Sequence, residues 1–189
     1  MTKFNPLQKI DDGMLYLANR GVQAWNWTTG RTKYDLSTVL HMAATASDGA
    51  GYVLSNDPNY LLIFSISVFT TGICTITNEL NNRREKNSSD VKVKPYLDDL
   101  DIPLSRFALG FSGWEFISAQ MHKPPMKYTI LANSVAFFSR SLAFYVNRAE
   151  SLPLRKNVLA RATEILKESS QPLPEFCKVG VNQRLEAMI

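Results

Sequence analysis

The sequence predicts an all-α protein, a four-helix bundle of two helical hairpins that is embedded in a membrane and flanked by N- and C-terminal amphipathic helices. The first observation is an uncharged apolar run from Tyr60 to Thr77. The second is another apolar run, Tyr128 to Val146, which holds a single charge, Arg140. The third is that residues 5–27 and the stretch after residue 151 place apolar residues at three- and four-residue steps, which is typical of helices with one apolar face.

Length and composition favour one domain, residues 1–189, without metal or disulfide staples. A chain of 189 residues can bury a core large enough to fold alone. The two cysteines, Cys74 and Cys177, are far apart, and two histidines do not make a histidine-rich metal centre. The net charge of +4 is distributed over several loops, whereas a nucleic-acid binder concentrates its basic residues on one stripe. We expect no metal, no cofactor and no nucleic-acid partner.

The predicted N-terminal helix covers residues 5–27. Asn5 can cap it, Pro6 suits its first position, and Gln8 stands where a capping box needs a glutamine. The indole rings of Trp25 and Trp27 near its end could anchor at a membrane interface. The alternative is that both tryptophans fill the core of a soluble protein.

The first predicted hairpin covers residues 35–78. Asp35 is the expected cap of its first helix, in which small residues recur every four positions and would let another helix approach closely. These small residues are Ala43, Ser47 and Gly51, with Ala46 and Ala50 beside them. A turn at Asp57-Pro58 then leads into the uncharged run.

The run from Tyr60 to Thr77 is the strongest indication of a membrane. No charge occurs from Pro58 to Asn78, and a rise of about 1.5 Å per residue lets the run cover about 30 Å, the thickness of a bilayer core. Serine and threonine residues dilute its apolar character, and its β-branched residues would also suit a strand. A buried soluble helix and buried strands are therefore the alternatives.

The remaining chain divides into three segments. Residues 79–102 form a polar connector that is expected to be a solvated loop. The second hairpin covers residues 103–147 and is broken at Pro124-Pro125. Residues 151–189 are expected to form the C-terminal amphipathic helix and a tail.

The distribution of basic residues predicts the topology. If both helices of each hairpin span the membrane, the basic connector lies on the same side as Arg148, and the opposite side holds only Lys123 and Lys127. The positive-inside rule then places both termini and the 79–102 connector in the cytoplasm. Since no cleavable signal is expected at the N-terminus, insertion would use an internal helix. Two spans are the alternative, but they would leave the basic residues from Arg148 onward outside.

Four polar residues within the predicted spans are the candidate functional residues: His41, Asp48, Glu115 and Arg140. An unpaired charge in a bilayer costs roughly 2.5 to 3.5 kcal/mol on insertion scales, so each needs a partner or a place near a helix end. A hairpin at the two prolines would bring Glu115 and Arg140 to similar depths. Glu115 is therefore the expected partner of Arg140.

The two hairpins resemble each other at a constant offset. Leu36 aligns with Leu104 and Tyr60 aligns with Tyr128. Such sparse matches can arise by chance. If they reflect a duplication, the two halves have an even number of spans and would be related by a two-fold axis along the membrane normal.

These observations predict a small polytopic membrane protein that acts as a subunit, scaffold or carrier. Its expected partners are membrane lipids and a protein partner or a second copy of the chain. The first alternative is a soluble all-α bundle that serves as a protein-interaction module. The second is an enzyme with Glu115 and Asp48 as acid and base, although no catalytic motif supports it.

Overall fold

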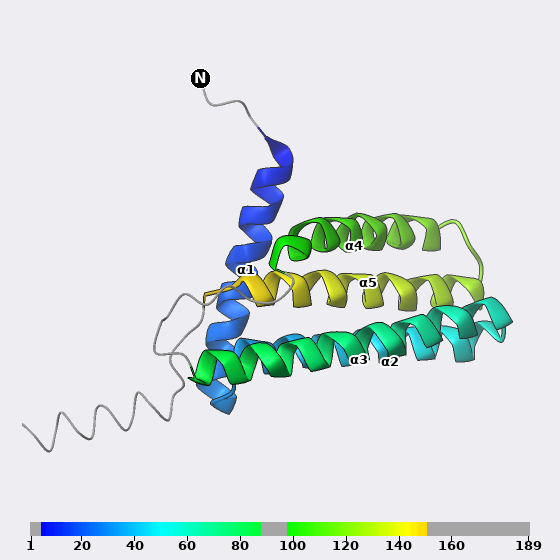
Figure 1. Cartoon of the computed structure of the whole chain (residues 1–189). Helices are drawn as coiled ribbons and strands as arrows, with labels where there is room; N and C mark the ends of the chain where they lie inside the picture. Colours follow the sequence, from blue (N-terminus) through cyan, green and yellow to red (C-terminus); the bar gives the residue numbers. More distant parts are fainter. Residues whose placement is uncertain (1–4, 88–97, 151–189) are drawn as a thin grey trace, which may run out of the picture. The chain divides into compact units, whose positions relative to one another are not determined.

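The computed structural model describes residues 5–87 and 98–150, which belong to the first of two compact units, residues 1–152. Every regular element in these residues is a helix, so the predicted all-α class is confirmed for them (Figure 1). The predicted C-terminal helix and tail, residues 151–189, lie outside the described residues. The helices are α1 (Pro6–Thr29), α2 (Lys33–Ser55), α3 (Pro58–Asn87), α4 (Asp98–Ala119) and α5 (Met126–Arg148).

The predicted start of α1 is confirmed. The side chain of Asn5 accepts a hydrogen bond from the backbone N–H of Gln8 at 3.4 Å, and Pro6 occupies the first helical position. Pro6 is suited to that position because its missing N–H would have no partner there. The helix ends at Gly30, whose φ of 68° lies in the left-handed region that glycine adopts without a steric penalty.

The start of α2 differs from the prediction. Thr32, rather than Asp35, is the N-cap: its side chain accepts from the backbone N–H of Asp35, and the Asp35 carboxylate accepts from the backbone N–H of Thr32. This reciprocal capping box satisfies two backbone donors at once. The helix therefore begins at Lys33, two residues before Asp35.

The predicted connector loop is partly helical. Residues 79–87 continue α3, and residues 98–102 form the beginning of α4. An i,i+4 ion pair between Glu79 and Arg83, at 2.7 Å, supports the extension of α3 into the polar sequence. Residues 88–97 lie outside the described residues.

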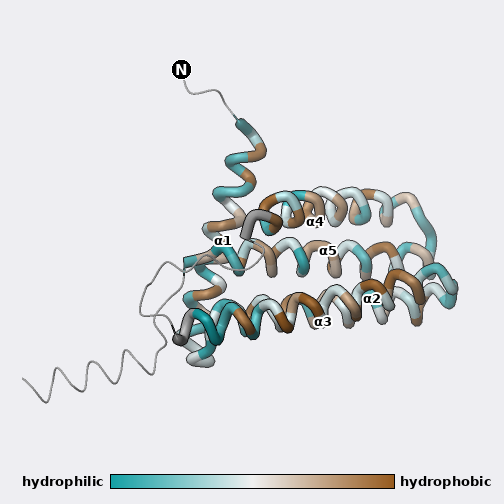
Figure 2. Tube along the Cα trace, viewed as in Figure 1, coloured by the Kyte–Doolittle hydropathy of each residue, from teal (hydrophilic) through white to brown (hydrophobic). Residues whose placement is uncertain are grey.

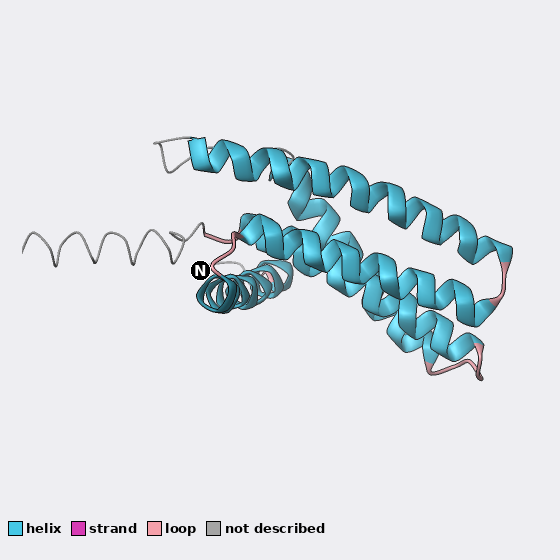
Figure 3. Ribbon diagram, turned by 90° about the horizontal axis from the view of Figure 1, so that it is seen from below, coloured by secondary structure: helices cyan, strands magenta, loops and turns pink. Residues whose placement is uncertain are grey.

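Helices α2 to α5 pack as an open row in the order α3, α2, α5, α4 (Figures 1 and 3). Helix α3 packs on α2, α2 packs on α5, and α5 packs on α4. Helices α3 and α4 are therefore the two ends of the row. This arrangement differs from the predicted bundle, in which the four helices would close around one core. The two helices of each hairpin run antiparallel. Helix α2 also runs antiparallel to α5, because Lys33 at the start of α2 donates a hydrogen bond to the carbonyl of Ala149, directly after α5.

The order of the row also contradicts the predicted two-fold relation between the hairpins. Under the proposed duplication, α2 corresponds to α4 and α3 corresponds to α5. A two-fold axis would bring two equivalent helices together at the centre, whereas α2 packs against α5 there. If the hairpins are repeats, a shift along the row relates them.

Helix α1 crosses the end of the row where α2 begins and α5 ends (Figure 1). Met14, Ala18 and Val22 pack there against Tyr145 and Val146 in a small apolar core. Polar contacts reinforce the crossing, because Asp11 accepts hydrogen bonds from the Tyr145 hydroxyl at 2.6 Å and from Arg106 Nε at 2.9 Å. One α1 side chain thereby joins three helices.

Candidate functional site, a buried polar seam

Burial along the row is inverted relative to a soluble protein. Small or polar side chains occupy the helix contacts, and large apolar side chains face outward. We call the buried and partly buried polar side chains between α2, α3 and α5 the polar seam. Its members are Ser37, His41, Thr45, Asp48, Ser67, Thr71, Asn78, Thr129, Asn133 and Arg140.

Arg140 is the centre of the seam. Its Nη2 donates hydrogen bonds to the Asp48 carboxylate on α2 and to the Ser67 hydroxyl on α3. The side chain of Arg140 is 12% exposed and that of Asp48 is 1% exposed. The Phe137 ring lies 5.6 Å from the guanidinium carbon and adds a cation–π contact. One guanidinium on α5 therefore links α5 to both helices of the first hairpin.

The predicted pairing of Arg140 with Glu115 is wrong. Arg140 projects from α5 towards α2, whereas Glu115 belongs to α4, on the other side of α5. Similar depth along the hairpin does not make two residues partners, because the direction of each side chain around its helix axis decides which neighbour it meets. The structure thus joins two of the four candidate residues, Asp48 and Arg140, and leaves Glu115 elsewhere.

Hydroxyl groups join α2 to α3 on one side of the ion pair. The hydroxyls of Thr45 and Thr71 lie 2.7 Å apart, and Ser67 donates to Thr45 at 3.0 Å. Towards the α1 end, the Asn78 amide donates to Ser37 at 3.2 Å. These residues were not among the predicted site residues. For Ser67 and Thr71 the signal is the serine and threonine content of the Tyr60–Thr77 run, which by itself indicates only a dilution of its apolar character.

The second hairpin is joined by the same chemistry. Ser112 donates to the backbone carbonyl of Ser134 at 2.9 Å, and Ser134 donates to the carbonyl of Ser112 at 2.9 Å. Ser141 donates to the carbonyl of Ser105, also at 2.9 Å. Polar contacts of this type stabilise helix pairs where a hydrophobic driving force is weak.

Small residues allow the close approach of α2 and α5, but not along the predicted stripe. Ala44 and Ala143 are fully buried, while Ala43, Ala46 and Ala50 face outward. Of the predicted residues, Gly51 is buried: a methyl group at this position would lie 3.3 Å from the side-chain oxygen of Asn133. The contact face of α2 is offset around the axis from the stripe that four-residue spacing indicated.

His41 lies in the seam next to the α2–α5 contact. It is buried, and its ring meets the Phe144 ring edge-on at a centroid distance of 5.4 Å. Four buried atoms of the seam have no hydrogen-bond partner among the described residues: His41 Nδ1, Asp48 Oδ1, Thr129 Oγ1 and Asn133 Oδ1. Within residues 5–87 and 98–150, no group of three His, Cys, Asp or Glu side chains is placed to hold a metal ion.

The two predicted interface anchors have different environments. Trp27 is 70% exposed, as an anchor in lipid headgroups would be. Trp25 is half-buried and borders a groove between α1, α2 and α5.

Two helices of the described chain are long and apolar enough to cross a membrane: α3 over Pro58–Arg84 and α5 over Met126–Arg148. Only 11% of the apolar stretch of α3 is buried, compared with 50% for α5. Figure 2 shows apolar residues recurring along α3. A core helix of a soluble protein is usually mostly buried, and α5 comes closer to that pattern than α3 does.

Comparison with protein families, curated proteins and solved structures found no match to this chain.

Proposed function

We propose that this protein is a small polytopic integral membrane protein, with α2 to α5 as four spans, that serves as a structural subunit or scaffold. The burial pattern of α3 carries the proposal. Ser67, Thr71 and Asn78 are buried on this helix, whereas Leu62 and Phe69 are 63% and 71% exposed. Lipid is a favourable environment for such an outward apolar face, and polar groups that face other helices find partners there.

The same arrangement in water would be unfavourable. Burying one large apolar side chain contributes roughly 1.5 to 3 kcal/mol, and α3 leaves Leu62, Ile66, Phe69 and Ile76 exposed. Exposed apolar patches of this extent in soluble proteins mark an interaction site or cause aggregation. The predicted alternative, a soluble interaction module, would have to cover this face with a partner.

The ion pair makes α2 and α5 compatible with a bilayer. Arg140 and Asp48 neutralise each other, so neither is an orphan charge at membrane depth. Arg106 stands in the third turn of α4 and pairs with Asp11 of α1. Glu115 is partly exposed on α4 and is the least well accommodated of the four candidates.

The orientation follows from the distribution of charge. Both hairpins begin and end at the α1 end of the row, where Arg31, Arg83 and Arg148 lie, while Lys123 and Lys127 flank the opposite turn. We propose that the α1 end faces the cytoplasm, in agreement with the positive-inside rule. Helix α1 then lies along the membrane surface as an interfacial helix.

Extraction of membranes at alkaline pH tests the proposal. The full-length protein, expressed in cells, should remain in the membrane pellet after carbonate treatment and should enter solution only with detergent. A protein that remains in the supernatant after ultracentrifugation without detergent would be a soluble protein, and the interaction-module hypothesis would replace this one.

A carrier is the second candidate function, because of the unpartnered atoms of the seam. Asp48 Oδ1 and Asn133 Oδ1 are buried without a partner at the α2–α5 contact, where a polar solute could be held. We would place a cysteine at Asn133 in a chain without Cys74 and Cys177 and treat membranes with a small water-soluble thiol reagent. Reaction at this position would support a water-accessible path, and protection would favour the scaffold.

A further inference from the structure

The contact between the two hairpins, where α2 packs against α5, is clamped at one end. Near α1, the buried Lys33 Nζ donates a hydrogen bond to the carbonyl of Ala149 at 2.6 Å, and the Ser37 hydroxyl donates to the carbonyl of Ala143 at 3.3 Å. Both bonds run from a side chain of α2 to the backbone in or directly after α5. The two hairpins are therefore held together beside α1.

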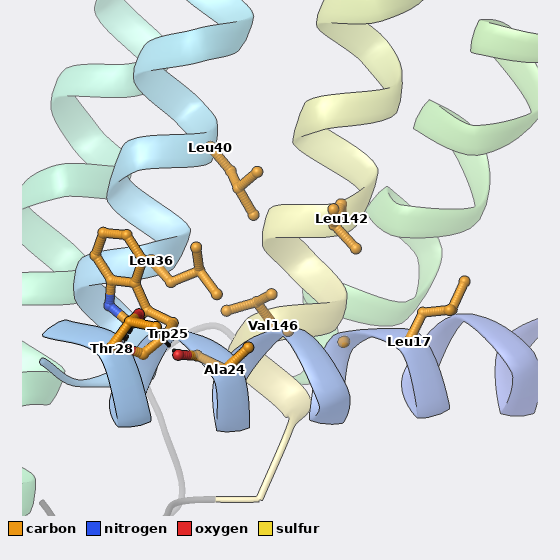
Figure 4. Close-up of a pocket in the computed structure, with 10 residues that line it drawn as sticks. Leu17, Ala24, Trp25, Thr28, Leu36, Leu40, Leu142 and Val146 are labelled. Carbon is orange, nitrogen blue, oxygen red and sulfur yellow. Dashed lines mark hydrogen bonds between the residues drawn. The ribbon is translucent and has the colours of Figure 1, made fainter. Parts of the chain in front are cut away.

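Helix α1 strengthens this clamp. Its Asp11 accepts hydrogen bonds from Tyr145 and Arg106, which belong to the second hairpin. Figure 4 shows Leu36 of α2 and Val146 of α5 pointing into the space above α1, where both line the same apolar groove. One crossing helix thus contacts both hairpins at this end.

The other end of the contact has no comparable clamp. We call it the turn end, because both hairpins turn there, at residues 56–57 and 120–125. Between the turn end and the buried ion pair, the described residues form one hydrogen bond between the hairpins, from the Tyr60 hydroxyl to Met126 Sδ at 3.9 Å. A thioether sulfur is a weak acceptor, so this bond contributes little to the contact.

Polar atoms near the turn end are buried without partners. Asn133 Oδ1 and Thr129 Oγ1 of α5 make no hydrogen bond within the described residues. A methyl group at Gly51 of α2 would lie 3.3 Å from Asn133 Oδ1, which places this atom against α2. A buried group without a hydrogen bond destabilises the packed state by its lost hydration, and separation of the helices restores that hydration. The closed contact is therefore less stable at the turn end than beside α1.

The contacts within each hairpin differ from this, because their polar groups are paired. In the first hairpin, the hydroxyls of Thr45 and Thr71 lie 2.7 Å apart. In the second, Ser112 and Ser134 each donate to the backbone carbonyl of the other at 2.9 Å. Each hairpin is thus joined more firmly within itself than to the other hairpin at the turn end.

Arg140 lies between the clamped and the unclamped parts of the contact. It donates hydrogen bonds to the Asp48 carboxylate and the Ser67 hydroxyl, both of which belong to the first hairpin. On α5, Ala136 and Ala143 stand about one turn away on either side of it, and both are fully buried. Arg140 therefore provides the last strong contact between the hairpins in the direction of the turn end.

We propose that the two hairpins hinge at the α1 end and separate at the turn end, with the contacts of Arg140 to Asp48 and Ser67 as the latch. In the open form, water enters between α2 and α5 from the turn end and hydrates Asn133 and Thr129, while the clamp beside α1 stays closed. Polar side chains within membrane spans face other helices or a water-filled cavity, and the two forms provide one environment each. The inference goes beyond a static scaffold and rests on the proposed membrane location, which brings the turn end to an aqueous surface.

Two alanines provide a matched pair of reporters. In a full-length chain without Cys74 and Cys177, Ala136→Cys places a thiol on the turn-end side of Arg140, and Ala143→Cys places one on the α1 side. The reagent is a water-soluble methanethiosulfonate with a quaternary ammonium group, applied to opened membranes so that it reaches both surfaces. We expect Ala136→Cys to react and Ala143→Cys to remain protected.

Two variants of α3 test the latch. Ser67 and Thr71 are buried one turn apart, but Ser67 bonds to Arg140 of the second hairpin, whereas Thr71 bonds to Thr45 of its own hairpin. Ser67→Ala should accelerate the reaction at Ala136→Cys roughly tenfold, because it removes a hydrogen bond to a charged group. Thr71→Val removes a hydroxyl that acts within the first hairpin, and it should leave this rate unchanged.

Several outcomes would overturn the proposal. Protection of Ala136→Cys both with and without Ser67→Ala would show that the hairpins do not open. Equal reaction at the two reporters would mean that the contact separates along its whole length, and faster reaction at Ala143→Cys would place the opening beside α1. An equal effect of Ser67→Ala and Thr71→Val would mean that any loosening of α3 exposes the site, so that Arg140 is not the latch.

Carbonate extraction of the same membranes separates this result from the proposed function. Protein that resists extraction but keeps Ala136→Cys protected would refute the hinge alone. Protein that is extracted would refute the membrane location, and the same two reporters, assayed on the soluble protein, would then decide the hinge separately.

Discussion

Arg140 of α5 donates a hydrogen bond to Asp48 of α2, which lies 92 positions earlier in the chain. This buried pair connects the two hairpins, and its link to Ser67 includes α3 in the same contact. Burying two charges together is seldom strongly stabilising, but burying one of them alone is costly. The pair therefore determines which helices can be neighbours more than how tightly they bind.

Removal of one partner should be worse than removal of both. We expect Arg140→Met or Asp48→Asn to lower the free energy of unfolding in detergent by about 3 to 5 kcal/mol, because each leaves an orphan group. The double variant should regain part of this loss in thermal melts.

The exposed pair Glu79–Arg83 is the matched control, with side chains that are 51% and 73% exposed. Its removal should change the free energy of unfolding by about 0 to 1 kcal/mol. If the Arg140 and Asp48 effects simply add in the double variant, the two residues are not coupled.

A charge in the middle of α3 should prevent membrane integration. Ile66 is exposed at the centre of the apolar stretch, so Ile66→Arg should cost roughly 2.5 to 3.5 kcal/mol on insertion scales. The measurement is the fraction of protein that resists alkaline extraction. Leu80→Arg, near the end of the same helix, is the control and should have a smaller effect, because a long side chain there can reach the interface. Equal resistance of the Ile66 variant and the wild type would contradict a span at α3.

Thiol labelling can test the orientation. In a chain without Cys74 and Cys177, we expect a cysteine at Ser89 in the connector to react with an impermeant reagent only after cells are opened. A cysteine at Lys123, in the turn between α4 and α5, should react in intact cells. The reverse pattern would mean that the α1 end of the row faces outward.

The contact between α1 and the row should weaken in acid. The hydrogen bond from Arg106 holds the pKa of Asp11 below its ordinary value, with Tyr145 contributing in the same direction. The folded state therefore gains stability above the ordinary aspartate pKa of about 3.9, and loses it as the pH falls through that value to the lowered one.

The protection of the α1 amides from hydrogen exchange in detergent, relative to the intrinsic exchange rate at each pH, would measure this loss. Asp11→Asn should remove the pH dependence in this range, while Asp12→Asn, which changes an exposed neighbour, should retain it. If the protection of the α1 amides in the wild type does not change with pH, Asp11 does not have this role.

Local signals predicted the helices and some of their ends. Asn5 and Pro6 identified the start of α1 because capping depends only on a few adjacent residues. The start of α2 differs from the prediction because Thr32 and Asp35 form the capping box together, whereas Asp35 alone predicts a later start. The charge of residues 79–102 predicts a loop, whereas a helix can continue into water when its own i,i+4 pairs support it.

By itself, the sequence determined that this protein is helical and contains apolar segments long enough to span a bilayer, because both properties are sums over consecutive residues. It also identified Asp48 and Arg140 as charged residues within predicted spans, each of which needs a partner or a place near a helix end. Only the tertiary structure decided that they pair with each other, that the contact face of α2 contains Ala44 rather than Ala43, and that the helices form an open row. The reason is that α3 is apolar around most of its circumference, and α2 carries small residues on several faces, so neither has a periodicity that selects one contact face. The direction of a side chain around its helix depends on the neighbours that the helix meets, and these are distant in the chain.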